Sequence, residues 1–435
     1  MNVGVISLGC SKNLVDTELM LGILQKAGYT ITRNEKEADI LIVNTCGFID
    51  SAKQESIDTL FQMNEYKTAG RCKLVVATGC LAQRYEKELM EEMPEIDLIM
   101  GVNQYPRLPE AIRRALDGDR FSCCQDDRTI LEGDRVLTTA GPTAYVRIAD
   151  GCDNRCAYCA IPLIRGGFRS RDIESVLEEI RSLAAQGREE IVLVAQDTSR
   201  FGIDRTGHSQ LPELMDRAAA IPGVKWLRVL YCYPDEISDE LLQVMASHDN
   251  ICRYLDLPLQ HADPQLLRRM NRRGDVDFTR SMLKKARDMG FILRTTFIVG
   301  FPGETDEQFE TLMDFVNEIR FDRLGAFSYS QEENTPAAAM PDQLEEDVKQ
   351  ARLDRLMTAQ QAISLERNQL RLGEECDVLI ETVCTDGTGI GRSAKEAPDT
   401  DGVIRISGVS REDAGHFIRA RITEADIYDL SGEKL

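Results

Sequence analysis

The stretch Gly151-Cys152-Asp153-Asn154-Arg155-Cys156-Ala157-Tyr158-Cys159 places three thiols within eight residues, directly after the apolar run 145–149. Thiolates are soft ligands, and three of them on one loop can converge on one metal centre. Zinc sites usually pair their cysteines as Cys-x-x-Cys and need a second pair, which the residues downstream do not offer. A disulfide cannot use three equivalent thiols. The loop therefore indicates an iron–sulfur cluster with three protein ligands, against the alternative of a structural or incidental use.

The composition is that of a globular protein with more than one domain. The chain has 435 residues, 43% of them hydrophobic and 29% charged, and this length predicts two or three domains. It has no run of about eighteen apolar residues, which excludes a membrane-spanning helix. The N-terminus enters a strand without a signal-type segment, so we expect a cytoplasmic protein. In a reducing compartment its thirteen cysteines are interpreted as metal ligands and as buried free cysteines without a chemical role.

The formal net charge is −21. Such a field repels nucleic-acid phosphates and attracts basic partners. The alternative interpretation is that the acidic balance serves only solubility.

Residues 1–100 alternate apolar strands with amphipathic helices. Near-continuous apolar strands separated by helices predict a doubly wound parallel sheet. The expected strands cover residues 3–8, 38–43, 73–77 and 97–100. The expected helices cover residues 14–27, 52–63 and 84–93.

Three further cysteines, Cys10, Cys46 and Cys80, each follow one of these strands. Because the carboxyl ends of parallel strands share one edge, these thiols are expected to be neighbours in space. Any one of these residues would ordinarily be interpreted as a buried free cysteine. Three at equivalent positions indicate a second cluster site with three cysteine ligands. Cys72 precedes a strand and is expected at the opposite edge. Adjacent Cys123 and Cys124 fall in a segment interpreted as a linker without chemistry.

From residue 140 to about residue 335 a longer alternation predicts a partial (β/α)6 barrel, whose active site gathers at the carboxyl ends of the strands. The expected strands lie near residues 145–149, 191–195, 227–232, 254–259, 292–299 and 324–329. The expected helices cover residues 173–186, 211–220, 238–247, 279–289 and 305–319.

Polar and glycine-rich residues follow the barrel strands. Gln196 follows the second strand, His261 the fourth, and Gly300 begins a glycine-rich stretch after the fifth. Such strand ends let backbone groups approach a polar cofactor closely. A plain turn is the alternative for 300–304, and a hydrogen-bonded structural role is the favoured interpretation of His261.

A helical connector over 345–372 is followed by short β segments near 376–383, 388–393, 402–406 and 417–428. This pattern predicts a small antiparallel β-barrel at the C-terminus.

With both cysteine triads and the small barrel placed, the whole chain resembles the methylthiotransferase family of radical S-adenosylmethionine (SAM) enzymes. The match extends around the central loop, from Asp150 through Ile161-Pro162 to Ser170-Arg171. The resemblance implies an N-terminal methylthiotransferase domain (1–115), a radical SAM core (138–368) and a C-terminal TRAM domain (370–435).

The resemblance also implies the cofactors and their ligands. Cys152, Cys156 and Cys159 would hold a 4Fe-4S cluster that binds SAM, and Cys10, Cys46 and Cys80 an auxiliary 4Fe-4S cluster. Tyr158, Gln196 and Gly300 are candidates to contact SAM. Reductive cleavage of SAM would give a 5′-deoxyadenosyl radical, and the auxiliary cluster would hold the sulfur that is transferred.

Two stretches resemble the branch of the family that modifies an aspartate of ribosomal protein S-twelve. They are Cys10-Ser11-Lys12-Asn13 and Gln196-Asp197-Thr198, where tRNA-modifying members typically carry Gln-Met-Asn after the cysteine and Gln-Asn-Val. The 398–402 loop fits the same branch. Phe201-Gly202 stands where the branch is expected to carry Tyr-Gly, and the aromatic ring at the first position is retained. From residue 371 to 435 there are eight Lys and Arg but fourteen Asp and Glu. An acidic TRAM domain suits a basic protein better than RNA.

The expected function is therefore addition of a methylthio group to the β-carbon of that aspartate, with a flavodoxin or ferredoxin as the kind of electron donor implied. One alternative is a tRNA adenosine methylthiotransferase, and another is a non-catalytic iron–sulfur RNA-binding module. Arg165, Arg169 and Arg171 could meet carboxylates of SAM or substrate, but solvated surface arginines are the favoured interpretation.

Overall fold

The computed structural model describes residues 1–125, 129–139 and 141–435. The chain is an α/β protein that divides into two compact units. The first unit combines residues 1–138 with 149–169 and 330–338, and the second combines 139–148 with 170–329 and 339–435. The cysteine loop 152–159 thus belongs to the same compact unit as the N-terminal sheet.

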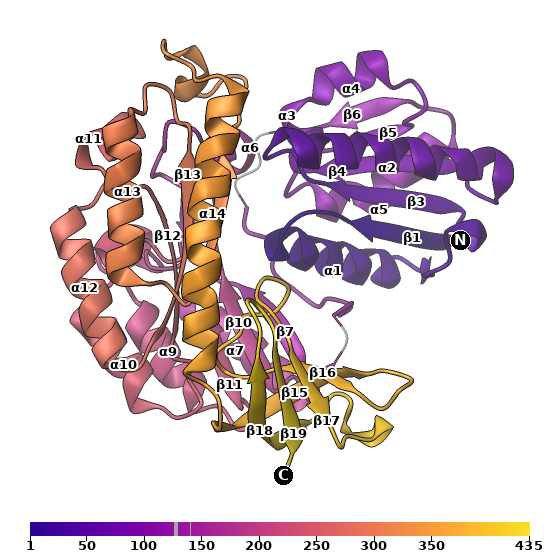
Figure 1. Ribbon diagram of the computed structural model, residues 1–435. Helices are drawn as coiled ribbons and strands as arrows, with labels where there is room; N and C mark the ends of the chain where they lie inside the picture. Colours follow the sequence, from indigo (N-terminus) through magenta and orange to yellow (C-terminus); the bar gives the residue numbers. More distant parts are fainter. Residues whose placement is uncertain (126–128, 140) are drawn as a thin grey trace. The chain divides into compact units, whose positions relative to one another are not determined.

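The first unit is built on a six-stranded parallel sheet, as the sequence predicts (Figure 1). The strands, in the spatial order β2-β1-β3-β4-β5-β6, are β1 (Asn2–Ser7), β2 (Thr30–Ile31), β3 (Ile40–Thr45), β4 (Leu74–Gly79), β5 (Leu98–Met100) and β6 (Phe121–Cys123). The helices are α1 (Ser11–Lys26), α2 (Asp50–Ala69), α3 (Cys80–Arg84), α4 (Glu86–Glu92), α5 (Leu108–Leu116) and α6 (Ile161–Arg165). Residues 121–123, expected to be linker, instead form the edge strand β6 parallel to β5.

Alternate residues of the central strands enter two separate cores. Ile40 and Ile42 of β3 pack with residues of α1 and α5 on one face. Leu41 and Val43 pack with residues of α2, α3 and α4 on the other. This double coverage explains why β3 and β4 are buried along their whole length and read as continuous apolar runs.

The second unit contains six parallel strands in two halves, which together form the predicted radical SAM type of partial barrel. One half has the order β11-β10-β7 and the other β12-β13-β14. These strands are β7 (Thr143–Arg147), β10 (Glu190–Val194), β11 (Trp226–Val229), β12 (Tyr254–Gln260), β13 (Ile292–Val299) and β14 (Arg323–Ser328). A bridge between Leu227 and Ile251 and a hydrogen bond from the Cys232 N–H to the Asp256 carbonyl (2.9 Å) link the halves.

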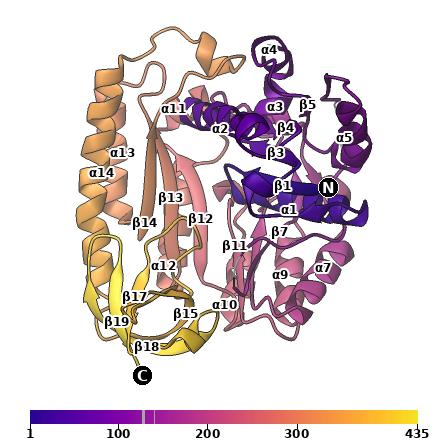
Figure 2. The ribbon, with the colours of Figure 1, turned by 90° about the vertical axis from the view of Figure 1, so that its right-hand side faces the viewer.

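Helices alternate with these strands, and Figure 2 shows α13 and α14 beside β13 and β14. Several of the helices begin at side-chain caps, such as the capping box of Thr305 and Gln308 in α13. The helices are α7 (Ile173–Ala185), α8 (Ile203–Thr206), α9 (Leu211–Ala219), α10 (Asp239–Ser247), α11 (Pro264–Arg269), α12 (Val276–Asp288), α13 (Asp306–Ile319) and α14 (Glu346–Gln369). The short strands β8 (Ala149–Asp150) and β9 (Arg169–Ser170) pair with each other.

The C-terminal segment forms the predicted small barrel, closed in the order β15-β16-β17-β19-β18. Its strands are β15 (Glu375–Val383), β16 (Gly389–Arg392), β17 (Ile404–Ser407), β18 (Phe417–Ala425) and β19 (Leu430–Lys434). Only β17 and β19 pair in parallel, and a core of aliphatic side chains fills the interior.

The loop 393–401, named the plug from here on, contacts the amino-terminal halves of the barrel strands. Asp399 accepts a hydrogen bond from the Tyr145 hydroxyl of β7 (2.6 Å), and Asp401 accepts one from the Tyr254 hydroxyl of β12 (2.6 Å). Glu396 pairs with Arg323 of β14 (3.2 Å). Part of the acidic excess of the TRAM segment therefore faces inward, which its residue count alone could not reveal.

None of the helices in the described part of the chain is long and apolar enough to cross a membrane.

Candidate iron–sulfur site

The three N-terminal cysteines lie at one edge of the six-stranded sheet, as predicted. Cys10 follows β1, Cys46 follows β3 and Cys80 follows β4, and these three strands are immediate neighbours. Ser7 is paired with Asn44 and Thr45 with Gly79, so the strands end level with one another. The parallel sheet thus brings together thiols that are more than thirty residues apart in the sequence.

Two glycines let these loops approach each other. A Cβ on Gly9, which has a φ of 85°, would lie 2.9 Å from the Cys46 Cβ. A Cβ on Gly79, which has a φ of 92°, would lie 2.5 Å from the Thr45 carbonyl oxygen. Both positions have a left-handed backbone as well as a close neighbour, so glycine is required for two reasons.

The three thiols differ in how readily they ionise. Desolvation alone would raise the pKa of Cys10, but the charges of Lys12 and Arg165 and backbone N–H groups outweigh it and lower the pKa. Burial raises the pKa of Cys46, and it raises that of Cys80 to about 12. Iron binds the thiolate form, so loading a cluster at this edge would release protons from Cys46 and Cys80.

The Cys152–Cys159 loop is tied down by its backbone. The Cys152 N–H donates to the Gly166 carbonyl (3.1 Å), and the Cys159 N–H donates to the Cys156 carbonyl (3.0 Å). Gly151, with a φ of 74°, packs so closely that a Cβ there would lie 2.7 Å from the Gly166 oxygen. These contacts fold the three-cysteine loop back on the segment that follows it.

Arg165 connects the two cysteine regions within the first unit. It is buried, and its guanidinium pairs with Asp16 (2.8 Å) and Asp150 (3.1 Å). It also donates to the Asn13 side chain (2.9 Å) and lies 3.9 Å from the Cys80 Sγ. Cys80 itself packs against Ala160 and Ile164 of the segment after Cys159.

The solvated-arginine interpretation is therefore wrong for Arg165, and it is also wrong for the other two arginines. Half-buried Arg169 pairs with Asp150 (3.3 Å), and buried Arg171 pairs with Glu179 (2.5 Å). The sequence did carry a signal for a cationic partner, because the polar residues Asn13 and Asp16 lie in the first two turns of the helix that follows Cys10. Their partner, more than a hundred residues away, could not be identified from spacing.

The donor set fits clusters in its chemistry. Each region offers three thiols, the ligand type that iron–sulfur clusters use. Within residues 1–125, 129–139 and 141–435, no three His, Cys, Asp or Glu side chains converge on a position for a single metal ion. The ligands of a four-iron cluster bind different irons and are spaced more widely than those of one ion.

The candidate SAM contacts lie where the sequence places them. Tyr158 is half-buried in the cysteine loop of the first unit. In the second unit, Gln196 follows β10 and Gly300 follows β13 at the carboxyl ends of the strands. A Cβ on Gly300, whose φ is 74°, would lie 2.9 Å from the Lys349 Cβ. This close approach accounts for the glycine by packing, and the SAM-binding roles of the three residues stay predictions.

His261 has the structural environment that was expected. Its Nδ1 accepts the Asp263 backbone N–H (3.0 Å), so Nε2 carries the proton and donates to Glu304 (3.2 Å). Glu304 also pairs with Arg352 (3.1 Å). Nδ1 thus holds the turn after β12, and Nε2 holds the loop after β13.

The remaining cysteines of the first unit have other surroundings. The Cys72 thiol donates to the Leu74 carbonyl (3.3 Å) at the start of β4, the opposite edge, as predicted. The Cys124 thiol donates to the Ala82 carbonyl (3.6 Å), and burial raises its pKa to about 12.

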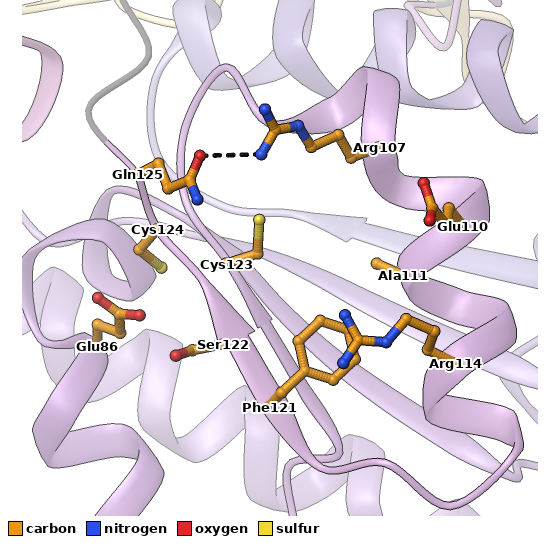
Figure 3. Close-up of a pocket in the computed structure, with 10 residues that line it drawn as sticks. All are labelled: Glu86, Arg107, Glu110, Ala111, Arg114, Phe121, Ser122, Cys123, Cys124 and Gln125. Carbon is orange, nitrogen blue, oxygen red and sulfur yellow. Dashed lines mark hydrogen bonds between the residues drawn. The ribbon is translucent and has the colours of Figure 1, made fainter.

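Cys123 and Cys124 also line a cavity of about 620 Å³ beside β6 (Figure 3). Two arginines on its wall are engaged with neighbouring side chains. Arg107 donates to the Gln125 side chain (2.9 Å), and Arg114 stacks on Phe121 (4.0 Å).

Three segments match known families. Residues 2–101 match the uncharacterized protein family UPF0004, residues 146–316 the radical SAM superfamily and residues 372–434 the TRAM domain.

Curated relatives match over the full length. The chain is 49% identical to a protein of Desulforamulus reducens named ribosomal protein uS12 methylthiotransferase RimO, covering 99% of both chains. It is also 49% identical to the protein of the same name from Pelotomaculum thermopropionicum, covering 100% of this chain and 99% of the other.

Solved structures share the fold at low identity. The radical SAM methyltransferase TsrM from Kitasatospora setae, with cobalamin and a [4Fe-4S] cluster bound, has a TM-score of 0.56 at 16% identity. The match covers 77% of this chain and 76% of TsrM. The cobalamin-dependent radical SAM enzyme OxsB has a TM-score of 0.51 at 12% identity, covering 83% of this chain and 56% of OxsB.

Proposed function

The chain belongs to the RimO family of ribosomal protein uS12 methylthiotransferases, and we propose on that premise that it adds a methylthio group to the β-carbon of an aspartate in uS12. The observation that carries the proposal is the presence of two three-cysteine sets in one compact unit. One cluster alone would account for radical formation, whereas a second set supplies a place for the sulfur that is inserted.

The ligands of the proposal are the two cysteine sets. Cys152, Cys156 and Cys159 would hold a 4Fe-4S cluster with SAM, and Cys10, Cys46 and Cys80 would hold the auxiliary 4Fe-4S cluster. When bound, SAM and the clusters supply a carbon-centred radical, a methyl group and a transferable sulfur. Tyr158, Gln196 and Gly300 are proposed to contact SAM.

The protein's own contribution at the auxiliary edge is positional. Arg165 holds Asp16 of α1 and Asp150 of β8 in one buried network and so fixes the loops that carry both cysteine sets. Its positive charge also lies beside Cys80 and favours an anionic group at this edge. Ser56 fixes Cys46 by accepting its backbone N–H and donating to its carbonyl oxygen (both 2.9 Å).

The surface of the TRAM barrel supports a protein substrate over tRNA. Four of its cations are already in ion pairs with carboxylates: Arg405 with Asp429, Arg419 with Asp377, Arg421 with Glu375, and Lys434 with Asp413. Phosphate binding requires cations that can neutralise it. A surface of interlaced charges with an acidic excess suits the basic protein uS12 instead.

The remaining parts of the proposal follow from the same reaction. An electron donor such as a flavodoxin or ferredoxin would reduce the clusters, and the enzyme would act in the cytoplasm. We keep 1–115, 138–368 and 370–435 as the proposed methylthiotransferase, radical SAM and TRAM domains.

Mass spectrometry tests the function directly. The reconstituted, reduced protein is incubated with SAM, a sulfide source and purified uS12 and, separately, with unmodified tRNA. The expected result is a methylthio group on one aspartate of uS12 and unchanged tRNA. Modification of tRNA adenosine with unchanged uS12 would contradict the proposal, and formation of no 5′-deoxyadenosine would favour a non-catalytic module.

A further inference from the structure

A groove between α2 and α4 of the first unit takes no part in the proposed site. It encloses about 540 Å³, a size within the roughly 300–1,000 Å³ of typical binding pockets. Its apolar lining comes from both helices and from α3: Ile57, Phe61, Leu81, Leu89 and Met93. Phe61 is 48% exposed, although exposing a large aromatic side chain to water is energetically unfavourable. We call this feature the α2–α4 groove.

The polar lining of the groove is almost entirely anionic. Its carboxylates are Asp50, Glu88, Glu92 and Glu333. The one cation in the lining, Lys53, is buried and pairs with Asp50 (2.6 Å), Glu332 (3.0 Å) and Glu333 (3.4 Å). Its charge is thus neutralised by the protein itself, and the groove presents a negative rim to a partner.

Glu333 is held in place as an ionised group. The Tyr85 hydroxyl donates to its carboxylate (2.5 Å), and this bond together with Lys53 lowers its pKa to about 2. Glu88 and Glu92 are exposed on α4, four residues apart on the same face. At neutral pH the rim therefore stays negative.

The groove is anchored to the auxiliary edge of the sheet. Ser56, on the helix that supplies Ile57 and Phe61, bonds both the N–H and the carbonyl of Cys46 (2.9 Å). Arg84, at the end of the helix that begins with Cys80, donates to the Gly47 carbonyl (3.0 Å). A partner seated in the groove is thus held by helices that directly follow two of the auxiliary cysteines.

We infer that the α2–α4 groove docks a basic segment of the protein substrate, with an apolar side chain against Phe61 and Lys or Arg side chains at the rim. An apolar floor with an exposed aromatic ring is typical of a protein-binding surface. The acidic rim repels nucleic-acid phosphates and favours cationic partners. The inference rests on the proposed function, because it takes uS12 as the occupant.

Charge reversal at the rim tests the inference. We compare E88K/E92K, in the groove, with E65K/E91K, which makes the same charge change at exposed positions of α2 and α4 outside the groove lining. The dissociation constant for purified uS12 is measured by fluorescence anisotropy at several salt concentrations, and KM and kcat for methylthiolation are measured in parallel. The expected result is a rise of roughly tenfold or more in Kd and KM for E88K/E92K, with a weaker salt dependence. The control should change less than twofold, and kcat should be preserved in both.

Phe61→Ala separates the apolar contact from charge. Because the ring is half exposed, its removal should leave the fold intact while Kd rises several-fold and the salt dependence stays as in the wild type. Formation of 5′-deoxyadenosine without uS12 checks that each variant carries a working radical site.

The outcomes separate the inference from the proposed function. Equal weakening by both charge reversals would show a general field effect and overturn the groove, as would wild-type KM values in both E88K/E92K and Phe61→Ala. A wild-type protein that modifies uS12 leaves the proposed function standing in either case. A wild-type protein that neither binds nor modifies uS12 would overturn the function and the groove together.

Discussion

The auxiliary edge of the N-terminal sheet and the base of the barrel both lie at the ends of parallel strands, but they are built from different chemistry. At the edge, β1, β3 and β4 end in three free thiols, and the buried Arg165 lies beside Cys80. At the base, the strands begin among buried charges that are paired with one another. Glu190 of β10 meets Arg392 (2.8 Å) and Arg228 (3.4 Å), and Arg294 of β13 meets Asp256 (2.5 Å).

The difference separates reactivity from stability. Ion pairing at the base satisfies buried charges that would otherwise be expensive to keep in the fold. A thiol can be protonated and therefore neutral. The thiols at the edge can stay in that form in the apoprotein and ionise when iron binds. Changes at the edge should therefore remove chemistry and leave the fold, whereas changes at the base should destabilise the fold and leave the clusters.

The largest effect is expected from replacing Cys10, Cys46 and Cys80 together with alanine. Methylthio transfer should be abolished, while reductive cleavage of SAM to 5′-deoxyadenosine persists, because the second cysteine set is intact. Iron after anaerobic reconstitution should fall from about eight to about four atoms per chain.

Cys72→Ala is the matched control, because this buried thiol lies at the opposite edge of the same sheet. It should keep the full iron content and the product yield. Product formation by the triple variant, or equal iron loss in the control, would refute the role given to the auxiliary edge.

The next largest effect is expected at the base from Arg392→Met. This change leaves the buried Glu190 carboxylate with Arg228 and Thr143 as partners, and breaking a buried pair typically costs about 3–5 kcal/mol. Urea unfolding followed by fluorescence of Trp226, the single tryptophan, is a suitable measurement, because its ring contacts Phe417 of the TRAM barrel edge-on (4.6 Å).

Arg405→Met provides the comparison at an exposed pair. Arg405 and Asp429 lie 3.1 Å apart with side chains 53% and 35% exposed, and such pairs contribute about 0–1 kcal/mol. The iron content should be unchanged in both variants. Equal destabilisation by the two changes would contradict a special role for the buried network.

These two regions also show what sequence could and could not predict. The auxiliary edge was found because each cysteine directly follows an apolar run, and parallel strands carry such positions to one edge. The network around Arg165 was missed, since Asp16 lies 149 residues away from it. The Glu190–Arg392 pair spans 202 residues. Local pattern fixes strand ends and faces, but pairing between side chains so far apart depends on the finished fold.

The same limit applies to the plug. The 398–402 stretch was correctly interpreted as a distinctive loop, yet its acidic residues were counted as part of an acidic surface. Asp401 is largely buried against Tyr254 and Arg294, and Glu396 is buried against Arg323 and Arg371. Net charge from composition cannot distinguish carboxylates that face solvent from those that neutralise buried arginines.

Acid should destabilise the base of the barrel. Burial alone would raise the pKa of Glu190 and Glu396, but their arginine partners outweigh it and lower both values from 4.5 to about 2. A lowered folded-state pKa means that these carboxylates stabilise the fold fully above about pH 4.5 and lose that contribution as the pH falls toward about 2.

The measurement is the melting temperature of iron-free protein between pH 3 and pH 7, followed by Trp226 fluorescence, with Glu190→Gln as the comparison. The wild type should lose stability below about pH 4.5. Glu190→Gln should start lower at neutral pH but show a flatter acid slope. An acid slope identical to that of the wild type would mean that Glu190 does not titrate in this window.

A smaller effect than that of Arg392→Met is expected at the rim of the plug, where water can replace a lost hydrogen-bond partner. Tyr145→Phe removes the hydroxyl that donates to Asp399, whose side chain is exposed, so the unfolding free energy should fall by only about 1 kcal/mol. Tyr254→Phe removes the corresponding donor to Asp401, which is largely buried and keeps the Ala397 N–H (2.8 Å) as a donor, and losing a hydrogen bond to a charged group typically costs about 1.5–3 kcal/mol. Measured side by side in urea, the Tyr254 change should therefore be the larger of the two. The reverse order would show that the plug is held mainly by Asp399 at its surface and not by Asp401 in its interior. The stability of the base of the barrel would then depend less on buried, paired charges than we infer here.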